Sequence, residues 1–206
     1  GQIVANGEQF ETHVIADKYG NLIDNGPDGG SVDAFGRQRV SNPYTLVDST
    51  MRYDKRADQW YEITAGGATT NFLTNASTLE LKTTTASGDS VLRRTKQRFP
   101  YQPGKAIFIL QSFVGATPTS GLTQEVGFFD DQNGVMVRAS GTTIQFVIRS
   151  FTTGSVVENV VSQSAWNINT LPSLDFSKAQ IFATDLEWLG VVRVRCGFVI
   201  DGEIKY

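Results

Sequence analysis

Short segments rich in Val, Ile, Phe and Thr recur along this chain, and in many of them apolar and polar residues alternate. Clusters of Gly, Asn, Asp and Ser separate the segments, whereas the 3.6-residue periodicity of an amphipathic helix is nearly absent. Alternation with a period of two, bounded by turn residues, is typical of strands in a sandwich or barrel. The pattern predicts an all-β protein, and we expect an antiparallel β-sandwich of jelly-roll or concanavalin-like type.

The clearest strands are predicted in the second half of the chain. Asn133-Gly134 tolerates the positive φ of a tight turn and predicts a hairpin of residues 124–130 and 135–140, which a third strand extends. Residues 106–110 are all apolar, so we expect their strand to be buried on both faces. Short helical turns are expected only near residues 162–169 and 174–179. The remaining strands are expected at residues 78–85, 91–99, 105–114, 143–149, 179–186, 190–200 and 203–206.

A Gly-rich break at residues 25–30 divides the chain into two predicted parts. Residues 1–31 are expected to form an extended N-terminal arm, in which residues 13–16 and 21–24 make a small hairpin. Residues 32–206 are expected to form the β-sandwich domain. The turn at Asp201-Gly202 opens a strand that stops almost at once, which leaves an unpaired edge. We therefore expect either that the domain continues past Tyr206 or that a neighbouring subunit completes the sheet.

Composition narrows the function classes. The net charge of -3 gives no reason to expect nucleic-acid binding. No apolar run approaches the roughly 18 residues of a membrane span and no signal peptide opens the chain, so we expect a soluble protein without a membrane partner. His13 is the single histidine and lies in the arm, which argues against imidazole catalysis. Cys196 is the single cysteine, and a small buried or interfacial thiol is the favoured interpretation.

Carboxylates offer the remaining route to catalysis or metal binding. A glycan hydrolase needs two Asp or Glu residues facing each other, and the candidates are Glu125, Asp130, Asp185 and Glu187. Solvent-facing strand and turn positions explain the same residues more simply. Asp130, Asp131 and Asn133 crowd one turn and could offer oxygen ligands to calcium, although turn geometry alone accounts for that pattern. We predict no catalytic residue, no metal and no cofactor.

A basic run at residues 93–98 interrupts the acidic chain. In an extended strand Arg94, Lys96 and Arg98 project to one face, where they could meet nucleic acid, an anionic polysaccharide or an acidic patch of a neighbouring subunit. A solvated face that pairs with residues such as Asp89 is the alternative. Because the chain is acidic overall, we favour a subunit contact over nucleic acid.

Aromatic residues in predicted loops could stack on sugar rings. The candidates are Trp60, Tyr61, Tyr101, Trp166 and Trp188, and the last of these is expected in a turn between two strands. Such residues more often plug the ends of a sandwich core. Host-surface glycan therefore stays a possible partner and not the leading one.

The segment Asp33-Ala34-Phe35-Gly36-Arg37-Gln38-Arg39-Val40-Ser41 continues as Asn42-Pro43-Tyr44-Thr45-Leu46-Val47-Asp48-Ser49. This run resembles the D-A-F-G-R-x-R-V-S signature of a group of tailed-phage virion structural proteins. The chain has Gln38 where Leu is common in that group, and Cys196 near a position that is often aromatic. Similarity to the same group returns, in order, at residues 99–105, 127–134, 165–167, 188–195 and 197–202, and it covers little of residues 1–31.

The resemblance implies a structural component of the virion, at the capsid surface or in a tail or fibre. Its partners would be other virion proteins and further copies of itself in a homo-oligomer. The resemblance also favours a chain that continues past Tyr206. Two alternatives stay open: a lectin-like module that binds host glycans and, less favoured, a two-carboxylate glycan hydrolase.

The signature itself is predicted to be a junction between the arm and the sandwich. Phe35 could anchor the segment by burial, and Arg37 and Arg39 would project to the same side of an extended strand. The candidate subunit interface comprises Asp33, Phe35, Arg37, Arg39, Arg94, Lys96 and Arg98.

Overall fold

The computed structural model of the chain describes residues 2–5, 8–11, 45–100, 102, 105–169, 174–188 and 192–206. In these ranges the regular structure consists of antiparallel strands and two 3-10 turns, so the predicted all-β class is confirmed. The described part of the chain holds no helix long and apolar enough to cross a membrane. The strands are β1 (Gln2–Ala5), β2 (Glu8–Glu11), β3 (Trp60–Ala65), β4 (Thr69–Leu73), β5 (Thr78–Lys82), β6 (Ser90–Thr95), β7 (Ala106–Val114), β8 (Thr123–Phe129), β9 (Gly134–Ser140), β10 (Thr143–Ser150), β11 (Val157–Ser162), β12 (Ala179–Trp188), β13 (Val192–Ile200) and β14 (Glu203–Lys205).

The described residues group into two compact units, with residues 45–100 in the smaller one and residues 2–5, 8–11 and those from 102 onward in the larger one. Strands β1 and β2 form a separate two-stranded sheet near the N-terminus, at residues that the sequence patterns did not single out. The hairpin predicted at residues 13–24 and the boundary predicted near residue 31 lie outside the described residues.

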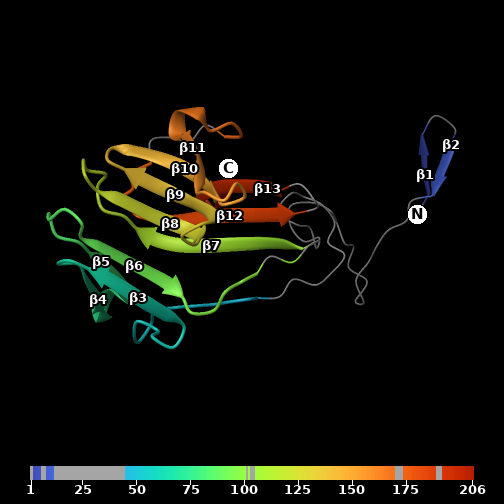
Figure 1. Cartoon of the computed structure of the whole chain (residues 1–206). Helices are drawn as coiled ribbons and strands as arrows, with labels where there is room; N and C mark the ends of the chain where they lie inside the picture. Colours follow the sequence, from blue (N-terminus) through green and yellow to red (C-terminus); the bar gives the residue numbers. More distant parts are fainter. Residues whose placement is uncertain are drawn as a thin grey trace. The chain divides into compact units, whose positions relative to one another are not determined.

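The first sheet of the larger unit is a meander with the strand order β11-β10-β9-β8 (Figure 1). The predicted hairpin between β8 and β9 is confirmed, and Asp130 N–H donates to the carbonyl of Asn133 at 2.7 Å. Gly134 has a φ of 142°, which few other residues adopt. The third strand of the meander is confirmed as β10, whereas β11 was not predicted.

The second sheet of this unit has the order β14-β13-β12-β7, so β12 returns from the meander to pair with β7 (Figure 1). The predicted turn at Asp201-Gly202 joins β13 to β14, and its two residues have φ values of 53° and 80°. Positive φ at both central residues is the geometry of a tight hairpin turn.

The core of the larger unit draws on both four-stranded sheets. Val137, Ala139 and Ile144 come from the meander, whereas Phe182 and Phe198 come from β12 and β13. Phe176, which precedes β12, joins the same cluster and is fully buried. The two sheets therefore share one apolar core.

Strand β7 corrects the prediction that residues 106–110 are buried on both faces. Half-buried and exposed residues alternate along the strand, and Phe113 packs against the core. Phe108, Leu110 and Val114 project to the other face and are exposed. A continuous apolar run does not predict burial on both faces here, because this strand lies at the edge of its sheet.

The unit of residues 45–100 consists of two small sheets, β3 with β6 and β4 with β5. Strands β3 and β4 were not predicted; Trp60 and Tyr61, which open β3, were expected in or near an irregular segment. Strand β6 begins as predicted but ends at Thr95 instead of Phe99.

Two short elements were expected near residues 162–169 and 174–179. The first is confirmed as the 3-10 turn η2 (Gln163–Ala165). The second is a turn without a helical segment, in which Lys178 N–H donates to the carbonyl of Asp175. The other 3-10 turn, η1 (Thr74–Ala76), was not predicted.

Candidate functional site

A connected group of charged side chains lies on the meander of the larger unit. We call it the Arg-Glu cluster: Glu125 on β8, Arg138 on β9, Arg149 on β10 and Glu158 on β11. Successive side chains in a strand point to opposite faces. Because Val137 and Ala139 face the core, Arg138 between them projects from the other face of the sheet.

Strand register brings the four side chains together. Glu125 lies directly across from Arg138, and Arg149 lies directly across from Glu158. Cross-strand neighbours on one face have Cβ atoms about 5 Å apart, within reach of long side chains. Each strand of the meander therefore contributes one charged residue to the cluster, acidic on the two outer strands and basic on the two inner strands.

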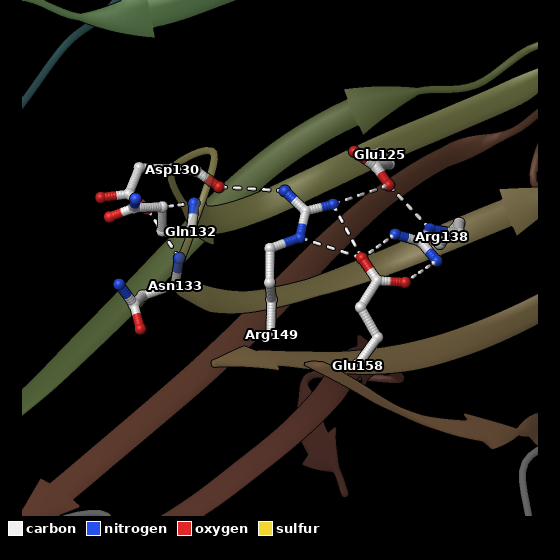
Figure 2. Close-up of polar contacts among 7 residues, drawn as sticks. All are labelled: Glu125, Asp130, Gln132, Asn133, Arg138, Arg149 and Glu158. Atoms are coloured by element: carbon white, nitrogen blue, oxygen red, sulfur yellow. Dashed lines mark hydrogen bonds and ion pairs between the residues drawn. The ribbon is translucent and has the colours of Figure 1, made fainter. Parts of the chain in front are cut away.

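Figure 2 shows both guanidinium groups turned toward Glu158. Arg138 donates from its two terminal nitrogens to the carboxylate oxygens of Glu158 at 2.7 and 2.8 Å, a bidentate pair, and its Nε donates to Glu125 at 2.7 Å. Arg149 donates from Nε to Glu158 at 2.9 Å and from a terminal nitrogen to the carbonyl of Asp130 at 3.0 Å. Arg149 also lies 3.7 Å from Glu125, which closes the network.

The cluster is electrically balanced, with two cations and two anions in contact. Hydrogen bonds from Arg138, and then from Arg149, lower the pKa of Glu158 to about 2. The same bonds to Glu158 raise the pKa of Arg138. A general acid needs a pKa near the working pH, so an ionised and doubly paired Glu158 fits a structural tie better than proton transfer.

The side chains of Asp130 and Asn133, at the β8–β9 turn, each accept backbone hydrogen bonds through Oδ1. Oδ1 of Asp130 accepts the backbone N–H groups of Gln132 and Asn133 at 2.8 and 2.7 Å. Oδ1 of Asn133 accepts the N–H of Phe151 at 3.1 Å. The described residues include no group of three or more His, Cys, Asp or Glu side chains that could hold a metal ion. The geometry therefore favours the turn explanation over calcium.

Asp185 and Glu187, the other predicted carboxylates, lie on β12 and are buried. They share one face of that strand, opposite the face that carries Phe182 into the core. Their cross-strand neighbours on β13 are Arg195 and Arg193, respectively. Glu125 also faces away from the core, but on the other sheet. Glu125 therefore lies on a different sheet from Asp185 and Glu187.

The prediction that Arg94, Lys96 and Arg98 project to one face of a strand is wrong. Because β6 ends at Thr95, strand alternation covers Arg94 but not Lys96 or Arg98. Arg94 lies over the ring of Tyr61 at 5.9 Å, Lys96 donates to the carbonyl of Ala57 at 2.6 Å, and Arg98 is exposed.

Arg93, on β6, instead contacts several other residues of this unit. It pairs with Glu62 at 2.5 Å, donates to the carbonyl of Lys55 at 2.6 Å and lies over the Trp60 ring at 4.8 Å. Burial raises the pKa of Glu62, but hydrogen bonds from Thr70 and Lys55 outweigh it and the pKa is lowered. Part of the basic run thus stabilises its own unit.

The predicted loop aromatics are mostly built into the fold. Trp60 opens β3 and its Nε1 donates to the hydroxyl of Ser49 at 2.8 Å, so its assignment to a loop is wrong. Trp166 stacks on Phe146 with ring centroids 4.0 Å apart and packs against the core, as expected of a core plug. Trp188 ends β12 and does not lie in a turn, and Tyr101 lies outside the described residues.

Two further predictions concern the thiol and the signature. Cys196 packs against the core, and burial raises the pKa of its thiol to about 12, which agrees with an inert buried cysteine. Asp33, Phe35, Arg37 and Arg39 all lie outside the described residues. The role of the signature as an interface stays a prediction.

Sequence reasoning missed Arg138, Arg149 and Glu158. A usable signal was present, because the Asn133-Gly134 turn fixes the register that places Glu125 opposite Arg138.

Comparison of the chain with family models, curated proteins and solved structures finds no match.

Proposed function

We propose that the chain is a structural component of a tailed-phage virion, at the capsid surface or in a tail or fibre. It acts by assembly, through contacts with copies of itself and with other virion proteins. The observation that carries the proposal is the signature at residues 33–49, followed in order by five further similar segments up to residue 202.

The chemistry of the described side chains supports an assembly role over catalysis. Glu125 is held by Arg138, Asp130 is used in a turn, and Asp185 and Glu187 lie on a different sheet from Glu125. A two-carboxylate hydrolase needs a pair that faces one cleft. These positions give that alternative no geometric support.

The contacts of two candidate tryptophans argue against the lectin-like alternative. Trp60 and Trp166 make hydrogen bonds and ring contacts within their own units, which leaves them poorly placed for stacking on a sugar. Binding to a glycan array that is abolished by Trp60→Ala, in a variant that keeps its fold, would restore that alternative.

For the fold we propose a β-sandwich of jelly-roll or concanavalin-like type with an extended N-terminal arm. The support is that two four-stranded antiparallel sheets contribute to one core. The arrangement of β7 beside β12, with the meander inserted between them in sequence, agrees with a double-sheet topology.

The direct test is immunogold electron microscopy of particles purified from the phage that encodes the chain. Gold at a fixed place on the particle is the expected result, and its position separates capsid surface from tail or fibre. Gold that is absent from intact and from partly disrupted particles refutes the proposal.

A further inference from the structure

Strand β7 has an unusual composition for the edge of a sheet. It ends the order β14-β13-β12-β7, and its nine residues include no charged residue and no proline. An edge strand presents unpaired backbone N–H and C=O groups, and proteins usually protect such an edge with charges, proline or a short length. Strand β7 has none of these protections.

The other strands that end the two large sheets are protected. Strand β8 carries Glu125 and β11 carries Glu158, both within the Arg-Glu cluster. Strand β14 has only three residues, and Lys205 and Glu203 on it form an ion pair. The contrast singles out β7 as the edge of this unit that is suited to pairing.

Three large apolar residues on the face of β7 that points away from the core are exposed. Phe108, Leu110 and Val114 are 41%, 55% and 66% exposed, and Ile181 on the neighbouring strand is 41% exposed. Ile181 pairs with Ser112, so it lies on the same face as these three residues. Edge and face together form one surface, which we call the β7 surface.

We propose that the β7 surface binds a second copy of this chain by antiparallel pairing of two β7 strands about a two-fold axis at Leu110. This interaction would supply the self-association that the proposed function requires, and it rests on that function for its biological role. The pairing would join two four-stranded sheets into one of eight strands.

The sequence of β7 is complementary to itself in this register. Leu110 would face Leu110 of the partner subunit, Phe108 would face the partner's Ser112, and Ala106 would face the partner's Val114. Even-numbered residues then meet even-numbered residues, which keeps both apolar faces on the same side of the joined sheet. A two-fold interface uses the same patch on both copies, so a self-complementary edge suits it.

The charges near the strand do not oppose this pairing. Lys105 precedes β7, and in the proposed register it lies across from Gly115 of the partner subunit. The two Lys105 residues then lie at opposite ends of a ladder about 30 Å long, at roughly 3.4 Å per residue. About eight to ten backbone hydrogen bonds form along nine paired residues.

The test measures molar mass by sedimentation velocity over a concentration series for three forms of the full chain. Wild type is expected to dimerise, and Leu110→Lys, which puts two like charges in contact at the axis, is expected to weaken dimerisation at least about tenfold. Val160→Lys is the matched control, because Val160 is a similarly exposed apolar residue on β11. Its dimerisation is expected to equal that of wild type.

If Leu110→Lys fails to fold, a cysteine variant provides a second test of the β7 pairing. Leu110→Cys places two thiols opposite each other at the axis and is expected to give a disulfide-linked dimer on mild oxidation, whereas Val160→Cys is not. Cys196 does not interfere, since it packs against the core. A monomeric wild type, or equal cross-linking of the two cysteine variants, overturns the proposal.

The outcomes also separate this inference from the proposed function. A chain that is found in particles but is monomeric in solution contradicts β7 pairing alone. A chain that dimerises through β7 but is absent from particles contradicts the virion role alone.

Discussion

Replacing Glu158 with Gln tests whether the Arg-Glu cluster ties the meander together by charge. Three hydrogen bonds from Arg138 and Arg149 reach this carboxylate, and they lower its pKa from the ordinary 4.5 to about 2. That difference corresponds to about 3 kcal/mol, at about 1.4 kcal/mol per pH unit. The side chain is 26% exposed, so solvent screening reduces the value, and we expect Glu158→Gln to lower the unfolding free energy at pH 7 by about 1–3 kcal/mol.

The lowered pKa of Glu158 also predicts how the stabilisation by this carboxylate changes with pH. A carboxyl group with a lowered pKa in the folded state stabilises the fold fully above its unfolded pKa, near 4.5, and loses that effect as the pH falls toward 2. The difference between wild type and Glu158→Gln is therefore expected to shrink below pH 4.5, to roughly half its pH 7 value near pH 3.

Urea unfolding at pH 7 and pH 3, followed by circular dichroism and tryptophan fluorescence, measures both values. Glu203→Gln is the control, because Glu203 forms an ion pair with Lys205 in the same unit but is largely exposed. Its effect is expected to be smaller than that of Glu158→Gln. Equal costs for the two substitutions, or an equal cost of Glu158→Gln at pH 7 and pH 3, would show that the charge of Glu158 does not tie the meander together.

Three further predictions concern the core and the thiol. Phe176→Ala removes a fully buried ring that contacts Phe113 and is expected to cost about 3–5 kcal/mol in urea unfolding; a cost below about 1 kcal/mol would contradict its place in the core. Gly127→Ala puts a methyl group against the Val135 carbonyl and is expected to cost about 1–3 kcal/mol, and an unchanged midpoint would contradict that close approach. Cys196 is expected to react with a thiol reagent at pH 8 only after urea is added, since burial raises its pKa; rapid labelling of the native chain would contradict this.

The sequence patterns located the strands of the larger unit well, because turn residues there have a single geometric explanation. Asn133-Gly134 and Asp201-Gly202 both lie at hairpin turns in the structure. Strand β11 escaped prediction because Thr, Gly and Ser precede it and its own alternation is weak. Propensity favoured a loop at a place where pairing with β10 determines a strand.

The candidate site was harder to predict than the fold. Burial of β7 was overestimated, since five consecutive apolar residues do not reveal whether a strand is central or at an edge. The Arg-Glu cluster depends on four strands in register, and Arg138 meets Glu158 across a strand that separates them. Such a contact follows from the complete sheet order, which local patterns do not specify.

Quantitative mass spectrometry of purified virions is the direct test of whether this chain is a particle component. We expect a defined copy number per particle that persists through repeated density-gradient purification and a high-salt wash. Loss of the chain from the particle fraction, with the protein recovered only in the soluble lysate, would contradict a virion role.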